Sequence, residues 1–261
     1  MNTDSPYVNG GNTTVRIPYC ENESSIFIEQ NEKKRVYPEI RIPSSIREID
    51  DISGGFKAGE VSWVSGTSAL IKKLPYHLCV NTVETFQNHS LFIDGGGTVN
   101  PYYLSMLAKQ KEQNIAEVLN QVHISRAFTV HQLVSLITEQ IEPVIKRYHH
   151  QTVILNDFPR LFFDPDVSVH ESMVLLKSVF STIRQLTQRY QLVTVLTFQY
   201  ESVKQQNNQL LSAVEKRSDE VMQMNTVHKC TRIVFPRRDK MTIVISDVFG
   251  QLSLMDFGMV I

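Results

Sequence analysis

The sequence is short of cysteine, of long apolar runs and of net charge. Its three cysteines, Cys20, Cys79 and Cys230, form no C-x-x-C pair and cannot all be joined in disulfides. This usage favours a reducing compartment and argues against a disulfide framework. No apolar stretch reaches the roughly 18–20 residues that cross a bilayer, and the first residues contain no secretory signal. We therefore expect a soluble intracellular protein with no membrane partner.

The formal net charge of −1 removes any global electrostatic reason to bind nucleic acid. A nucleic-acid surface on this chain must therefore be a local cluster of cations. No metal site is expected, because His149 and His150 have no carboxylate or cysteine at ligand spacing. What the sequence does have is 261 residues with 42% hydrophobic side chains, enough for one large globular domain or two small ones.

The chain divides into a polar N-terminal part and an alternating core. Residues 1–25 have few apolar anchors, so we expect a mobile tail there. Ser25–Glu29 alternates apolar and polar residues and is a candidate edge strand. We therefore place a flexible tail at 1–43 and a single core domain at 44–261.

Apolar periodicity in the core predicts strands alternating with helices, hence a mainly parallel sheet covered on both faces. The expected strands are 60–65, 90–94, 122–125, 152–155 and 192–198, and the expected helices end at 86 or cover 101–110, 130–145 and 169–190. The polar stretch 201–224 is interpreted as a flexible loop or a surface helix. Three strands near 231–235, 241–248 and 251–255 are expected to close the chain as an antiparallel meander.

The most informative stretch follows the first expected strand. The phosphate-loop pattern G-x-x-x-x-G-K-[ST], laid from Gly66, falls on G-T-S-A-L-I-K-K. Gly66 and Lys72 fit the pattern, but Ile71 replaces the second glycine and Lys73 replaces the hydroxyl that binds Mg²⁺. We expect Ile71 to strain the loop and crowd the phosphates, and Lys73 to place a cation beside the metal. The stretch is interpreted as a degenerate phosphate loop.

The segment before this loop, SSIREIDDISGGFKAGE, resembles the entry to the ATPase core of RadA-type recombinases, the archaeal and eukaryotic relatives of RecA. Four later segments resemble family elements in the same order. They are LFIDGGGTVNPYYL, ISRAFTVHQL, TVILNDF at the Walker B strand and TVLTFQ at the strand that ends in a sensor glutamine. The resemblance covers about 44–261 and implies a RecA-like core acting in homologous-recombination DNA repair. It implies a nuclear protein in a eukaryote and a cytoplasmic one in an archaeon.

The resemblance also implies which residues would form a nucleotide site. Asp157 is the candidate Walker B carboxylate, and Gly96 stands where the family has its water-activating glutamate. Gly66, Lys72 and Asp157 are therefore interpreted as a vestigial nucleotide site without a catalytic residue. We expect ATP and Mg²⁺ to bind weakly or not at all, with no other cofactor.

Three hypotheses follow. The favoured one is a non-catalytic recombinase paralogue, a pseudo-ATPase that serves as a binding or scaffold subunit. The alternative is a slow, real ATPase, DNA-dependent or with a partner that completes the site. A third places the chain among circadian-clock-like or archaellum-accessory relatives, which share the Gly-Gly-x-x-x-Gly-Glu entry.

Candidate partners are another RecA-like subunit and single-stranded DNA. Phe27 is the candidate anchor for the subunit contact. In the family, two loops face the filament axis; here the first, Asp164–Val169, is acidic and the second spans 201–224. Cations near the second loop form the candidate DNA surface, or else a solvated hairpin: Lys216, Arg217, Arg237, Arg238 and Lys240.

Overall fold

A computed structural model of the chain describes residues 39–200 and 209–245. Two short strands and a helix begin it: β1 (Arg41–Ile42), α1 (Arg47–Ser53) and β2 (Phe56–Lys57). The parallel part follows as β3 (Val61–Gly66), α2 (Leu70–Phe86), β4 (Ser90–Asp94), α3 (Pro101–Gln110), α4 (Ile115–Gln121), β5 (Val122–Arg126), α5 (Val130–Ser135), the π-helix η1 (Leu136–Gln140), α6 (Ile141–Tyr148) and β6 (Thr152–Asn156). The remainder is the 3₁₀ helix η2 (Arg160–Phe163), α7 (Val169–Tyr190), β7 (Val193–Gln199), α8 (Gln209–Arg217), β8 (Glu220–Val227), β9 (Cys230–Phe235) and β10 (Lys240–Ile245).

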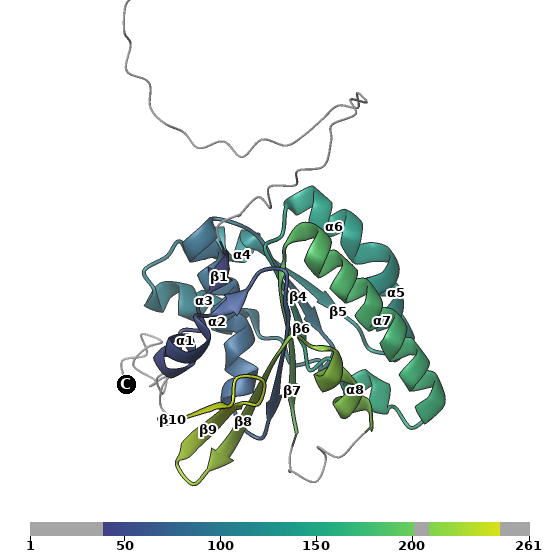
Figure 1. Cartoon of the computed structure of the whole chain (residues 1–261). Coiled ribbons are helices and arrows are strands. Elements are labelled where there is room, and N and C mark those ends of the chain that lie inside the picture. The colour runs from purple at the N-terminus through teal and green to yellow at the C-terminus, as the bar shows by residue number, and fades with distance from the viewer. Residues whose placement is uncertain (1–38, 201–208, 246–261) are drawn as a thin grey trace, which may run out of the picture. The chain divides into compact units, whose positions relative to one another are not determined.

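One eight-stranded sheet carries the core, in the order β10-β9-β8-β3-β7-β6-β4-β5. The strands from β8 to β5 in this order are parallel, and β9 and β10 add to β8 antiparallel. Helices α1 to α4 cover one face and α5 to α8 cover the other (Figure 1). Alternate residues of the central strands feed the two cores, as Trp63 and Val64 of β3 show. The expected fold class, a mainly parallel α/β sheet with an antiparallel meander, is confirmed.

The composition of the meander differs from the expectation. Residues 220–224, interpreted as part of a loop or surface helix, belong to strand β8, which pairs with β3 and β9. Val221, Met222 and Met224 are buried there, so packing in the sheet outweighs the weak strand preference of Met and the polar residues between them. The meander is thus β8–β9–β10, and only 209–217 of the stretch is helical. The strand expected near 251–255, the candidate strand Ser25–Glu29 and Phe27 lie outside the described residues.

Three histidines meet at the amino edge of the parallel strands. Nδ1 of His123 in β5 lies 2.8 Å from Nε2 of His150, which precedes β6, so the two rings share a hydrogen bond. His89, which precedes β4, stacks on His123 with ring centroids 5.1 Å apart. Burial lowers the pKa of all three rings, to about 3 for His150. Within the described residues no group of His, Cys, Asp or Glu is arranged to hold a metal ion.

Candidate functional site

The turn between β3 and α2 is the site that the sequence singled out, and strand β8 lies directly against it. Gly66 ends β3 with φ of 148°, and a Cβ on this residue would lie 1.9 Å from the carbonyl oxygen of Met224. No side chain fits at such a distance. Gly66 is therefore required by the close approach of β8, whether or not a phosphate ever binds beside it.

Two amides of the turn donate to β8. The Thr67 N–H donates to Oδ1 of Asn225 at 3.3 Å, and the Ser68 N–H donates to the carbonyl of Met224 at 3.0 Å. The Thr67 hydroxyl in turn accepts from the Thr226 N–H at 3.1 Å. These bonds fasten the turn to a strand that is about 160 residues away in the sequence.

The next amides are used within the turn itself. The Leu70 N–H donates to the Ser68 hydroxyl, the Ile71 N–H to the Ser68 carbonyl and the Lys72 N–H to the Ala69 carbonyl, each at 3.2 Å. A phosphate loop binds its ligand with backbone N–H groups that point at the phosphates. Here five such groups already have acceptors inside the protein.

Ile71 does not have the strained backbone that we expected from its position in place of the second glycine. It is the second residue of α2 and is absent from the residues with positive φ in the described chain. Its side chain is 1% exposed and packs in the core with Leu70, Leu74 and other residues on the α1–α4 side. Ile71 therefore continues a regular helix and adds to the core, and the prediction of a strained backbone was wrong.

The candidate nucleotide residues Lys72 and Asp157 border one small space. Its volume is about 10 Å³, which holds one water molecule at most. The side chain of Lys72 is exposed at this point. The other residues that line the space are Ile71, Thr98, Asn156, Thr197 and Gln199.

Asp157 lies just past the end of β6, in a left-handed conformation with φ of 55°. Its Oδ2 accepts from Nε of Arg160, and its buried Oδ1 has no hydrogen-bond partner among the described residues. Burial raises the pKa of this carboxyl, and the charges of Arg160 and Lys72 oppose that change. A Cβ on Gly96 would lie 2.6 Å from Asp157 Oδ2. The carboxylate thus occupies the space that a side chain at position 96 would need.

Asp94 at the end of β4 organises the glycine loop that follows it. The fully buried carboxylate accepts from the N–H groups of Gly96 (3.2 Å) and Val99 (2.9 Å) and from Nδ2 of Asn156 (3.2 Å). Nε of Arg126 lies 3.4 Å from it, so its charge is partly compensated. Asn156 also bonds the hydroxyls of Thr98 and Thr197. Sequence reasoning missed this network, because only the parallel register of β4 and β6 brings Asp94 and Asn156 to the same level.

The site therefore combines a glycine at the end of β3, a lysine in the first turn of α2, a carboxylate at the end of β4 and another just past β6, all at the carboxyl edge of a parallel sheet. A family model for Rad51 matches residues 39–249. The chain belongs to the Rad51 family. Its sheet is accordingly a RecA-like recombinase core, the family identified above by resemblance, and members of this family generally assemble with one another and bind DNA.

The candidate DNA-binding cations lie elsewhere on the Rad51 core than expected. The turn between β9 and β10 and the end of α8 both lie at the amino edge of the sheet, opposite the edge at which β6 and β7 end. Arg237 donates to the carbonyls of Glu215 and Lys216 at the end of α8, and Arg238 pairs with Glu220. Arg217 donates to the carbonyl of Ala213. Five cations do cluster, but three of them have partners inside the protein.

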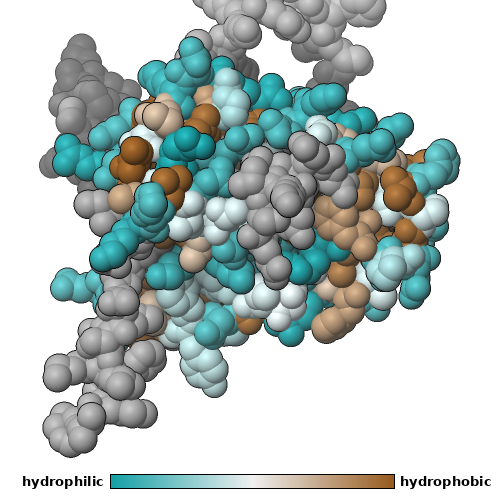
Figure 2. Space-filling model, turned by 90° about the horizontal axis from the view of Figure 1, so that it is seen from below, coloured by the Kyte–Doolittle hydropathy of each residue, from teal (hydrophilic) through white to brown (hydrophobic). Residues whose placement is uncertain are grey.

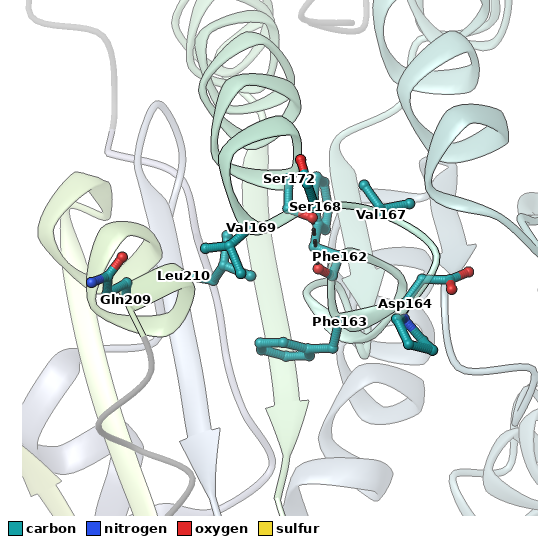
Figure 3. A pocket seen from close by; sticks show the side chains of 10 residues that line it. Phe162, Phe163, Asp164, Val167, Ser168, Val169, Ser172, Gln209 and Leu210 are labelled. Carbon is teal, nitrogen blue, oxygen red and sulfur yellow. Dashed lines mark hydrogen bonds between the residues drawn. The ribbon is translucent and has the colours of Figure 1, made fainter.

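A cavity of about 670 Å³ lies between η2, the start of α7 and the start of α8 (Figure 3). Phe163, Val169 and Leu210 give it apolar walls, and Asp164 at its rim is the one charged residue among the described residues that line it. It opens at the carboxyl edge of the sheet, where apolar and hydrophilic surface alternate in patches (Figure 2). An apolar hollow beside a carboxylate does not favour phosphate, in agreement with the acidic character of 164–169.

No helix in the described residues is both long and apolar enough to cross a membrane.

Proposed function

We propose that this chain is a non-catalytic member of the Rad51 family that works as a binding or scaffold subunit in homologous-recombination repair. The observation that carries the proposal is the use of five backbone N–H groups between Thr67 and Lys72 inside the protein. To bind a triphosphate there, the chain would have to give up these bonds, each worth about 0.5–1.5 kcal/mol. The side chain of Lys72 is exposed at this point, and one lysine is a weak phosphate site.

Nucleotide binding and turnover test this proposal directly. We expect no saturable binding of a fluorescent ATP analogue with Mg²⁺, and no phosphate release above the buffer rate. Lys72→Ala should leave both measurements unchanged, and Lys73→Ala is the matched control on the neighbouring turn position. Phosphate release that is lost in Lys72→Ala and kept in Lys73→Ala would overturn the proposal.

The second candidate function is a slow ATPase whose site is completed by a partner. It is favoured by Asp157, which borders the same small space as Lys72 and whose buried Oδ1 has no partner within the described part of the chain. A cation or a donor from a neighbouring subunit would satisfy this atom. Turnover that appears only when a RecA-like partner is added, and that Asp157→Asn abolishes, would establish this function.

The partner that we propose is another RecA-like subunit. A stable contact should bury about 1,200–2,000 Å² in total, and aromatic residues contribute most to such contacts. Phe27, outside the described residues, remains our candidate anchor. Light scattering and co-purification should recover a RecA-like partner that Phe27→Ala releases. A chain that stays monomeric and recovers none would contradict the scaffold role.

A further inference from the structure

The antiparallel end of the sheet has one buried face and one uncovered face. Ile233, Phe235 and Val244 point into the core beneath α1 and α2 and are fully buried. On the opposite face Met241 and Ile243 of β10 are each 58% exposed. Apolar side chains usually occupy one face of such strands, with polar residues facing water. Here the second face also carries exposed apolar side chains, beside the polar Gln223, Asn225 and Arg232.

The exposed side chains form one continuous surface. In the register of the strands Met241 lies opposite Val234, Ile243 opposite Arg232, and Cys230 opposite Val227. Val227 is 43% exposed, and Arg232 is exposed among them. We call this surface the meander face: Val227, Cys230, Arg232, Val234, Met241 and Ile243.

The meander face continues a side of the sheet that helices cover elsewhere. On this side α8 packs on β3 and β8 through Leu211 and Val214, which share a core with Val221. Beside α8 a hollow of about 230 Å³ separates the helix from the sheet at Trp63 and Gln223. In Figure 1 the turn that joins β8 to β9 projects at the lower left, away from the helices. The sheet therefore extends past its last covering helix.

The sequence that follows β10 has the composition to cover this face. Residues 246–261, SDVFGQLSLMDFGMVI, contain nine apolar residues out of sixteen. Their only charged residues are Asp247 and Asp256, which suit a face whose charged member is Arg232. The segment starts where β10 ends, at the level of Cys230. Sixteen residues reach roughly 50 Å when extended, while three strands span only about 10 Å across the sheet.

We propose that residues 246–261 return over the meander face and bury Met241 and Ile243. The tether gives the segment an effective concentration that is typically millimolar. A second copy of the chain, or another protein, would therefore need to bind unusually well to displace it. The inference does not depend on the nucleotide site, since no residue of the meander face lines that site.

A coupling experiment tests the proposal. In the full chain, Met241→Thr with Ile243→Thr should lower the melting temperature by about 2–4 °C for each side chain, because covered apolar groups are lost. In a chain that ends at Ile245 the same pair should change it by less than about 1 °C. Val174→Thr is the control, because Val174 is 52% exposed on α7 and far from the segment in sequence. Equal shifts in the two chains, or coupling found only in a dimer, would overturn the proposal.

A second measurement uses the full chain alone, in case the shortened chain does not fold. In a Cys20→Ser, Cys230→Ser background, a thiol at Ile243→Cys should react with an alkylating reagent at least about tenfold more slowly than one at Val174→Cys, because burial restricts access. Equal rates would show that position 243 is open, and residues 246–261 would then not cover the face.

Discussion

Mild acid should destabilise this protein, because two buried histidines are held in their neutral form. The pKa of His77 is lowered from 6.5 to about 4 and that of His150 to about 3, in both cases mainly by burial. As the pH falls below 6.5, these two histidines therefore bind protons in the unfolded chain but stay neutral in the folded chain. Stability from these groups is complete above pH 6.5 and is lost as the pH falls toward the folded pKa values.

The magnitude follows from the two shifts. Between pH 7 and pH 5 each histidine should reduce the free energy of unfolding by about 2 kcal/mol, so together they cost about 4 kcal/mol. This is a large part of the roughly 5–15 kcal/mol of a typical domain. Burial raises the pKa of Asp50 and Asp157, and these groups act in the opposite direction.

Urea unfolding at pH 5, 6 and 7 measures the effect, followed by the fluorescence of Trp63, the single tryptophan, which is 1% exposed. Because the carboxyl groups contribute equally to the pH dependence of every variant, their contribution cancels when a histidine variant is compared with the unchanged chain. His150→Gln should reduce the pH dependence between 7 and 5 by about 2 kcal/mol, and His228→Gln, at an exposed position, is the matched control. A His150→Gln chain with the full pH dependence would refute the reasoning.

Three further outcomes are expected. Gly66→Ala should destabilise the fold by at least about 3 kcal/mol in urea unfolding, because its Cβ would collide with the Met224 carbonyl; a mild effect would show that β8 can move away. Gly96→Glu should fail to produce ATP turnover in a phosphate-release assay and should lower the melting temperature, since the new side chain displaces Asp157; turnover would favour the slow-ATPase function. Lys216→Ala with Lys240→Ala should weaken single-strand binding and reduce its logarithmic salt slope by about 1.4; an unchanged slope in a binding titration would remove these cations from the DNA surface.

The regular elements could be predicted from local pattern. Ser168 caps α7 through a hydrogen bond to the Glu171 N–H, and the apolar stripe from Val169 to Tyr190 matches the observed helix. Asn100 likewise begins α3 with a side-chain cap. In these segments the residues that fix the structure are neighbours in the sequence, so the sequence alone is sufficient.

The candidate site could be located but not understood from the sequence. The turn after β3 was found because glycine and lysine stand at the right spacing. Whether the N–H groups of this turn are free depends on Met224 and Asn225, which accept hydrogen bonds from Ser68 and Thr67. These contacts come from the pairing of β3 with β8. Dependence on distant residues also explains why 220–224 was wrongly expected to be a loop or helix. Burial in the sheet makes this segment strand β8, against its local preference. Long-range pairing leaves no local pattern in a single sequence.

The contact between the β3–α2 turn and β8 also bears on how this chain could change over generations. A mutation from Ile71 to Gly would remove a core side chain and leave the acceptors Met224 and Asn225 in place. A mutation from Lys73 to Thr would supply a hydroxyl with no phosphate beside it. Each of these single substitutions would thus cost stability or give no benefit. If the chain is the non-catalytic subunit that we propose, nucleotide binding would return only when several positions in two distant segments changed together. For such a subunit, selection acting on one substitution at a time would not favour a return to ATPase activity.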